Sequence, residues 1–251
     1  MGAQYLILIP ALLTSLATAA LALRGRRAEP LAVELEETVT LFVSDIHYRE
    51  GDETPRLIAS LARRFGAGRL VVLGDLFDDL HRPLTHDELG RCVRGALSPV
   101  LETVDEIVYV ISGGQHDPIV PGTLRLDLGP RVLVTDRPLH ATIGGQGFLL
   151  THGDVAILNG AVAYAVNRAA RVLGCDLFLE KALRARFRLG PRDWLIMGHT
   201  HLPGIDGTWR VANTGCWKRT WALGIRYWRR PTFTAVVYDL REVELIRLEV
   251  A

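Results

Sequence analysis

Histidine and aspartate residues gather in five short pieces of this 251-residue chain, each after a short apolar run. In order, the pieces are Asp45-x-His47, Gly74-Asp75-x-x-Asp78, Gly114-Gln115-His116-Asp117, His152-Gly153-Asp154 and Gly198-His199-x-His201. Alternate residues of an extended chain point the same way, so a D-x-H or H-x-H pair can bind one ion from one side. Imidazole and carboxylate ligands without cysteine suit Mn²⁺, Fe²⁺, Zn²⁺ or Co²⁺. The pieces therefore predict a divalent metal site.

The elements that must position these pieces alternate between strand and helix patterns from Thr38 onward. Residues 39–43 and 69–73 are short apolar runs, and residues 54–66 between them show helical spacing with a Thr-Pro start and a glycine stop. Later strands are expected to end in polar residues, and residues 232–250 read as a closing hairpin. Because ligands in α/β folds gather beyond the ends of strands, we expect an α/β fold with the five pieces at one edge.

In their order and spacing, the five pieces resemble the calcineurin-like metallophosphoesterases, whose pattern is D-x-H, G-D-x-x-D, G-N-H-D or G-N-R-D, a lone His, and G-H-x-H. The resemblance runs from about Thr40 to Trp217 and includes "NTGC" at 213–216, where the family often has Asn-Pro-Gly-Ser. It implies an αββα two-sheet sandwich over residues 39–251. It also implies a hydrolase of phosphoester or pyrophosphate bonds that uses two divalent ions, with Mn²⁺ the first expectation.

The same resemblance assigns the ligands of the first ion. Asp45, His47 and His201 would bind it, and Asp75 would bridge both ions. His116 matches the histidine that in many members contacts the substrate phosphate or protonates the leaving group, so Asp75 and His116 are the expected catalytic residues. Two divalent ions less two carboxylates leave a charge of about +2, which suits a phosphate dianion.

For the second ion, the resemblance assigns His152, His199 and Gln115, although the family has Asn where this chain has Gln. Both side chains offer the same neutral amide oxygen. The remaining carboxylates of the pieces are expected to orient histidines or cap turns rather than bind metal. These are Asp78, Asp117 and Asp154.

The N-terminal region has a different character. Residues 5–23 carry no charge, are long enough at about 28 Å of helix to cross a bilayer core, and are followed at once by "RGRR". We expect residues 1–27 to form a transmembrane anchor and residues 28–38 a linker. Since the basic cluster follows the apolar run, the catalytic domain is expected in the cytoplasm. The alternative is a cleaved signal peptide with export, because "ATA" and "ALA" offer small-residue cleavage sites.

Two stretches bear on the substrate. "GDLFDD" and "GHTHLPG" resemble motifs of the bacterial UDP-2,3-diacylglucosamine pyrophosphohydrolases of the lipid A pathway, which carry Arg in place of His116. In those enzymes a helical cap precedes the second motif, so residues 155–192 are expected to form a cap-like insertion in which Arg184 and Arg188 contact the substrate. The expected substrate is then a phosphate or diphosphate ester that is nucleotide- or lipid-linked and lies at the membrane.

Two alternative functions stay open: a general phosphodiesterase or phosphatase of small substrates, and a non-catalytic binding protein on the same fold.

Composition limits the kinds of partner that the chain can be expected to bind. A net charge of +1 gives no electrostatic case for nucleic acid. Three widely spaced cysteines offer no disulfide framework. The sequence leaves the oligomeric state and the native metal undetermined.

Overall fold

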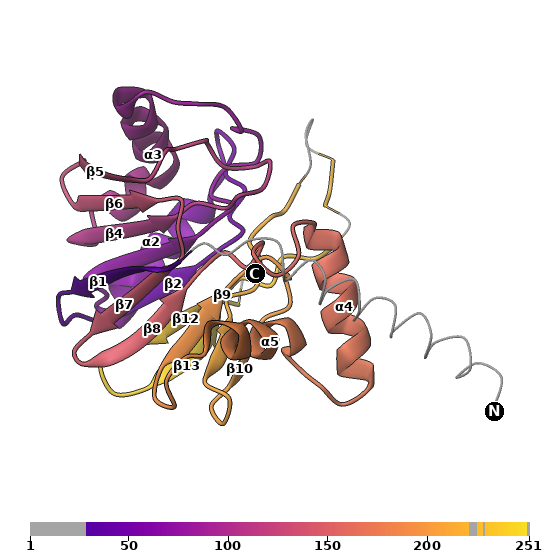
Figure 1. Ribbon diagram of the computed structural model, residues 1–251. Coiled ribbons are helices and arrows are strands. Elements are labelled where there is room, and N and C mark those ends of the chain that lie inside the picture. The colour runs from indigo at the N-terminus through magenta and orange to yellow at the C-terminus, as the bar shows by residue number, and fades with distance from the viewer. Residues whose placement is uncertain (1–28, 221–224, 228, 250–251) are drawn as a thin grey trace.

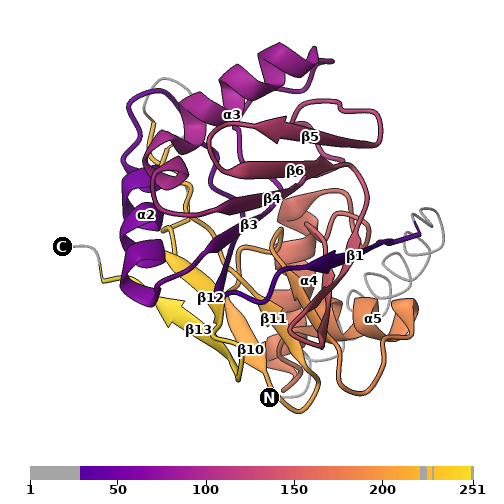
Figure 2. The ribbon, with the colours of Figure 1, turned by 90° about the vertical axis from the view of Figure 1, so that its left-hand side faces the viewer.

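The computed structural model describes residues 29–220, 225–227 and 229–249. These residues form two sheets that face each other, with helices on the outer sides (Figures 1 and 2). The first described sheet has seven strands in the order β13-β12-β2-β3-β4-β6-β5, and the second has six in the order β1-β7-β8-β9-β11-β10. The predicted mixed α/β two-sheet sandwich is confirmed.

The bounds of the elements follow the chain. The strands of the first sheet are β2 (Thr40–Val43), β3 (Arg69–Leu73), β4 (Glu106–Val110), β5 (Thr123–Asp127), β6 (Arg131–Thr135), β12 (Thr234–Tyr238) and β13 (Val243–Arg247). Those of the second are β1 (Leu31–Leu35), β7 (Leu139–Ile143), β8 (Gln146–Leu150), β9 (Trp194–Met197), β10 (Gly204–Asp206) and β11 (Val211–Asn213). The described helices are α2 (Thr54–Phe65), α3 (His86–Leu101), α4 (Gly160–Val172) and α5 (Phe178–Phe187).

The central strands are buried on both faces, which explains why they read as unbroken apolar runs. In β2, Leu41 packs under helices α2 and α3, whereas its neighbour Phe42 points into the core between the two sheets. The Phe42 ring lies 5.7 Å from the ring of Phe148 in β8 of the opposite sheet. Helix α2 begins with Pro55 in its first turn and ends at Gly66 in a left-handed conformation, as the sequence predicts.

Five strands, three from the first sheet and two from the second, end at one common edge. Strands β2, β3 and β4 run parallel in the first sheet, and β8 and β9 run parallel in the second. Each of these five strands is followed directly by one of the five polar pieces. The fold therefore delivers all five pieces to one edge of the sandwich.

The region expected as a linker, residues 28–38, is in part a strand, which corrects that expectation. Leu31–Leu35 form β1, which pairs in parallel with β7. Alternation explains the strand, because Leu31, Val33 and Leu35 pack against the core between the sheets while the residues between them are exposed. The predicted closing hairpin does form, as β12 and β13.

Residues 155–192, expected as a cap-like insertion, form α4 and α5. Leu183 of α5 packs with Leu195 of β9 and Val211 of β11, so α5 covers the outer face of the second sheet. Helix α4 packs on α5 and stands at the side of the sandwich (Figure 1). The predicted anchor, residues 1–27, lies outside the described residues. None of the helices described is long and apolar enough to cross a membrane.

The packing between the sheets leads to a stability prediction. Phe42→Ala should lower the free energy of unfolding by about 3–5 kcal/mol, because a large side chain is removed from a closed core. Val172→Ala is the matched control, since Val172 is 80% exposed and its truncation should change stability by less than about 0.5 kcal/mol. Urea unfolding followed by circular dichroism measures both, and equal midpoints for the two variants would contradict the assigned core.

Candidate metal centre

The backbone at the shared edge is strained where the predicted ligands lie. Left-handed φ angles occur at Asp45 (50°), His47 (51°), Asp75 (48°), His199 (67°) and His201 (57°). For residues other than glycine this region costs roughly 1–2 kcal/mol each, and such strain clusters at functional sites. The D-x-H and H-x-H side chains thus converge through kinked turns, not through the extended backbone that the sequence pattern suggested.

Two motif glycines permit this close approach. At Gly74 the backbone is left-handed (φ 71°), and an added Cβ would collide with the ring of His152. At Gly198 an added Cβ would collide with Ser44 and the carboxylate of Asp45. The two glycines therefore let side chains from one sheet touch the backbone of the other.

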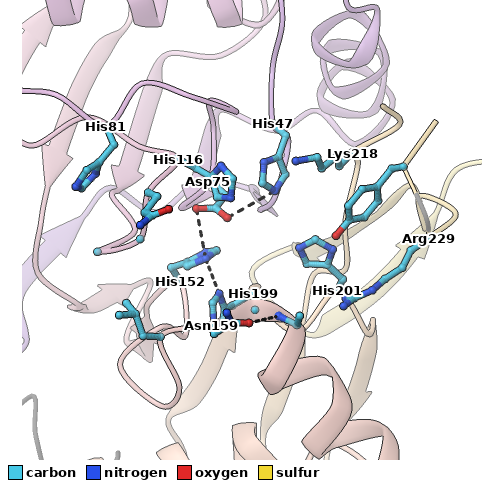
Figure 3. A pocket seen from close by; sticks show the side chains of 17 residues that line it. His47, Asp75, His81, His116, His152, Asn159, His199, His201, Lys218 and Arg229 are labelled. Carbon is cyan, nitrogen blue, oxygen red and sulfur yellow. Dashed lines mark hydrogen bonds and ion pairs between the residues drawn. The ribbon is translucent and has the colours of Figure 1, made fainter. Parts of the chain in front are cut away.

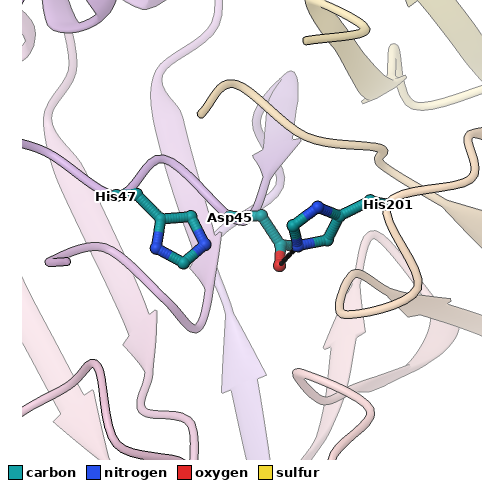
Figure 4. A group of neighbouring side chains, drawn as sticks. All are labelled: Asp45, His47 and His201. Atoms are coloured by element: carbon teal, nitrogen blue, oxygen red, sulfur yellow. Dashed lines mark ion pairs between the residues drawn. The ribbon is translucent and has the colours of Figure 1, made fainter. Parts of the chain in front are cut away.

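The first cluster contains Asp45, His47 and His201, whose ligand atoms lie within 4.8 Å of one another (Figure 4). His201 Nε2 lies 2.9 Å from Asp45 Oδ1. The other oxygen, Asp45 Oδ2, accepts hydrogen bonds from the Ser44 hydroxyl and the His199 backbone N–H. His47 Nε2 is buried and makes no hydrogen bond, whereas Nδ1 faces Asp78. Buried polar atoms that converge in this way fit a metal ion.

The second cluster centres on Asp75, whose two oxygens face different histidines. Asp75 Oδ2 lies 3.6 Å from His47 Nε2, and Asp75 Oδ1 lies 3.6 Å from His152 Nε2 (Figure 3). His199 Nδ1 lies 2.9 Å from His152 Nε2. The ligand atoms of Asp45, Asp75 and His152 also lie within 4.8 Å of one another. Asp75 therefore stands between the two groups of histidines, where a bridging ligand must stand.

Backbone carbonyls fix the orientation of three imidazoles. His152 Nδ1 donates to Leu73 O (2.8 Å), and His199 Nε2 donates to Ile157 O (2.6 Å). His116 Nδ1 donates to the carbonyl of Asp78 (2.6 Å). A neutral imidazole carries one N–H, so a neutral ring held in this way presents its other nitrogen as an acceptor. His199 Nδ1 faces His152 Nε2 at 2.9 Å, and that contact requires a second proton on the His152 ring.

The three carboxylates expected to support the site do so. Asp78 Oδ1 lies 3.2 Å from His47 Nδ1, which orients that ring. Asp117 is fully buried and accepts backbone N–H bonds from Asp75 (2.8 Å) and Ser112 (2.9 Å). Asp154 Oδ2 accepts the N–H of Gly113 (2.9 Å).

A buried polar network holds the H-x-H loop. Asn213, the first residue of "NTGC", donates from Nδ2 to Gly198 O (2.7 Å) and to Glu180 Oε1 (2.7 Å). Glu180 is fully buried in α5, and its Oε2 accepts a bond from Asn167 of α4 (2.8 Å). Burial raises the pKa of the Glu180 carboxyl. The network ties both helices to the loop that carries His199 and His201.

Burial and charge act in opposite directions on the histidines. Burial lowers the pKa of His47 to about 4, and burial together with the neighbouring His152 lowers that of His199 to about 4. Both are therefore neutral near pH 7, as a metal ligand must be. For His152, burial alone would lower the pKa, but Asp75 and Asp45 raise it to about 9. An ion must displace that proton, so metal binding at His152 should strengthen as pH rises toward 9.

The clusters line one wall of a cavity of about 600 Å³ (Figure 3). Gln115 lines it too and is exposed, while its ligation of the second ion stays a prediction. Other lining residues were not foreseen from the sequence: His81, Leu158, Asn159, Lys218, Tyr227 and Arg229. The available signal was the run of basic and aromatic residues at 217–230, directly after "NTGC".

The two arginines predicted to contact substrate do not line the cavity. The Arg184 guanidinium donates to the carbonyls of Asp193 (2.5 Å) and Gly190 (2.6 Å), which closes the loop before β9. Arg188 ends α5 in a left-handed conformation. The basic wall of the cavity comes instead from Lys218 and Arg229.

Comparisons with solved structures give low sequence identities and low TM-scores. A Vps29 single mutant from Entamoeba histolytica is 14% identical with a TM-score of 0.44, covering 84% of this chain and 99% of that chain. The phosphoesterase YfcE from E. coli is 18% identical with a TM-score of 0.39, covering 84% and 100%. An archaeal phosphodiesterase is 15% identical with a TM-score of 0.40, covering 84% and 99%. No family model and no curated protein matches this chain. Likenesses this weak carry no assignment of family or activity.

The geometry predicts how metal binding responds to mutation. The purified chain should bind two Mn²⁺ ions, and His152→Ala should abolish the second binding step because it removes a ring already oriented toward Asp75. Asp79→Asn is the control, since Asp79 is exposed in the loop after β3 that carries Asp75 and does not line the cavity. Isothermal titration calorimetry with elemental analysis measures both. Wild-type stoichiometry in His152→Ala would show that this histidine is not a ligand.

Proposed function

We propose that this protein is a dinuclear-metal-dependent hydrolase of phosphoester or diphosphate bonds. The observation that carries the proposal is the position of Asp75, which faces His47 with one oxygen and His152 with the other on the wall of an open cavity. Asp45, His47 and His201 would hold one ion. The other ion would be held by Asp75, His152, His199 and Gln115. Mn²⁺ is the first choice for both, and Fe²⁺, Zn²⁺ and Co²⁺ suit the same ligands.

Two such ions would lower the pKa of a bound water and neutralise the oxygens of a phosphate group. His116 supplies the proton donor in this proposal. Its Nδ1 is held by the Asp78 carbonyl, and His116 belongs to a group with His47 and Asp75 that each offer a ligand atom within 4.8 Å of the others. From that position a doubly protonated His116 would pass its Nε2 proton to the leaving oxygen as the ester bond breaks, which leaves a neutral ring.

Lys218 adds positive charge to the same wall. Its ammonium is buried and lies 2.5 Å from Asp78 Oδ1 and 5.2 Å from the centre of the Tyr227 ring. Asp78 also accepts from Arg49 Nε (2.7 Å). Because Lys218 lines the cavity together with the metal ligands, its ammonium would contact a phosphate oxygen of the substrate.

For the substrate, we favour a nucleotide- or lipid-linked diphosphate or phosphate ester at the membrane. The motif similarities and the uncharged run at residues 5–23 support this class, and a membrane-anchored protein with a cytoplasmic catalytic domain would follow from it. Export after signal-peptide cleavage is the alternative location. A general phosphodiesterase or phosphatase of small substrates is the alternative activity.

Hydrolysis of an aryl phosphodiester by the purified full chain tests the proposal. Activity should require added Mn²⁺ and disappear with EDTA. Asp75→Asn should lower kcat by at least about 10³-fold, comparable to the loss of a transition-state charge stabiliser. Lys218→Met should mainly raise KM, and Asp79→Asn should change neither constant. Metal-replete protein without turnover on aryl, nucleotide and lipid phosphates would instead support a binding protein on this fold.

A further inference from the structure

Helix α4 carries an apolar stripe on its outer surface. Val162 is 49% exposed, Val172 is 80% exposed and Leu173, directly after the helix, is 66% exposed. Ala161 and Ala165 are exposed on the same helix. The opposite side is buried against α5 through Ala163 and Val166. A 13-residue helix spans about 20 Å, so this stripe is a long apolar surface by the standard of a soluble domain.

The stripe begins at the mouth of the cavity. Leu158, which is 54% exposed, and Asn159, the N-cap of α4, both line the cavity beside His199. Figure 3 shows α4 starting directly below the histidines. The segment after β11 joins the same rim, because the Arg229 guanidinium lies 3.7 Å from the centre of the Tyr164 ring of α4. That segment adds Ile225, which is 62% exposed.

The charge of this rim is mostly positive, with Asp176, which pairs with Arg171 (3.1 Å), at its far end. Residues 155–175 contain no Asp or Glu and include Arg168 and Arg171, both exposed. Residues 207–238 also contain no Asp or Glu, and they carry Arg226 and Arg230 at exposed positions. An apolar surface edged by arginines complements a bilayer with anionic headgroups.

The register of the second sheet shows where the N-terminal region enters the fold. Leu31 at the start of β1 pairs with Leu139, and Leu139 pairs with Leu150, two residues before His152. With strands about 4.8 Å apart, Leu31 lies about 10 Å from Leu150, at the metal-bearing edge. The chain is fixed as far back as Glu29, whose carbonyl accepts two bonds from Arg137 (3.0 and 2.6 Å).

Five residues separate Glu29 from the uncharged run that ends at Leu23. Six residue steps reach at most about 22 Å. A bilayer that holds residues 5–23 would therefore lie close to the edge of the sandwich that carries the metal ligands and α4.

We propose that the exposed stripe of α4, with the basic segment after β11, docks on the surface of an anionic bilayer and turns the cavity mouth toward it. The inference rests on the proposed function and narrows it: the substrate is an amphiphilic phosphate ester taken from the membrane surface. The bilayer is favoured over a second protein copy because the rim carries a net positive charge and two identical basic rims would repel each other.

Photo-crosslinking of the full chain tests the docking. The protein is reconstituted in vesicles of phosphatidylcholine with a minority of phosphatidylglycerol and a lipid carrying a diazirine on its acyl chain, and labelled peptides are mapped by mass spectrometry. Residues 158–173 should be labelled together with residues 5–23. The double variant Val162→Glu/Val172→Glu should lose labelling at 158–173 severalfold and keep it at 5–23. Trp209→Glu, a 50% exposed aromatic position before β11 at the end of the second sheet away from the metal-bearing edge, is the matched control and should leave both unchanged.

The remaining outcomes each contradict the inference in a distinct way. Labelling at 5–23 without 158–173 would exclude docking by α4 and leave the anchor in place. Labelling at neither would exclude the membrane. Links between two copies at 158–173, formed by a bifunctional protein cross-linker on the same vesicles, would assign the stripe to a second copy. Hydrolysis of the aryl phosphodiester, measured on the same samples, should be equal in all variants. Its absence in wild type would reject the proposed function independently of the labelling.

Discussion

Two buried carboxylates, Asp45 and Asp75, set the electrostatic problem that the surrounding structure must solve. Asp45 is fully buried and Asp75 nearly so, and their ligand atoms lie within 4.8 Å of each other. Two negative charges at that separation repel by roughly 3–4 kcal/mol at an effective dielectric constant of 20. Neutral His47 and His199 cannot balance them. The raised pKa values of His152 and His201 are the response of the metal-free protein, because each ring can hold a second proton beside the carboxylates. Divalent ions balance the same charge more completely.

The fold meets this requirement by joining two sheets at one edge. Carboxylates come from β2 and β3 of one sheet, and His152 and His199 follow β8 and β9 of the other. The strained turns that present them are stabilised from outside by Asp117 and by the network of Glu180 with Asn213. Strain of this kind persists only where packing on both sides over-determines the backbone. The interface between the sheets therefore supports the site as well as the stability of the protein.

Much of the site could be predicted from the sequence because metal ligands need particular residue types at particular spacings. The five pieces and the supporting role of Asp78 follow from that pattern, whereas the two-sheet arrangement was implied by the resemblance to the calcineurin-like metallophosphoesterases. The other features of the fold and of the cavity depend on tertiary contacts, which leave no periodic pattern in the sequence. Strand β1 looked like a linker because it is short and stands among glutamates, Glu29, Glu34, Glu36 and Glu37. Lys218 and Arg229 reach the cavity only because the segment after β11 folds back over it. Arg184 was expected to contact the substrate because a basic helix pattern does not reveal which partner each arginine meets.

The central claim is that Asp75 bridges two ions, and electron paramagnetic resonance of the Mn²⁺-loaded chain tests it most directly. Ions bridged by one carboxylate lie about 3.5–4 Å apart, so their spins couple. At two equivalents of Mn²⁺ the account predicts the multiline spectrum of a coupled pair, replaced in Asp75→Asn by the six-line spectrum of isolated ions. An isolated six-line spectrum from wild-type protein with two Mn²⁺ bound would contradict a bridged pair.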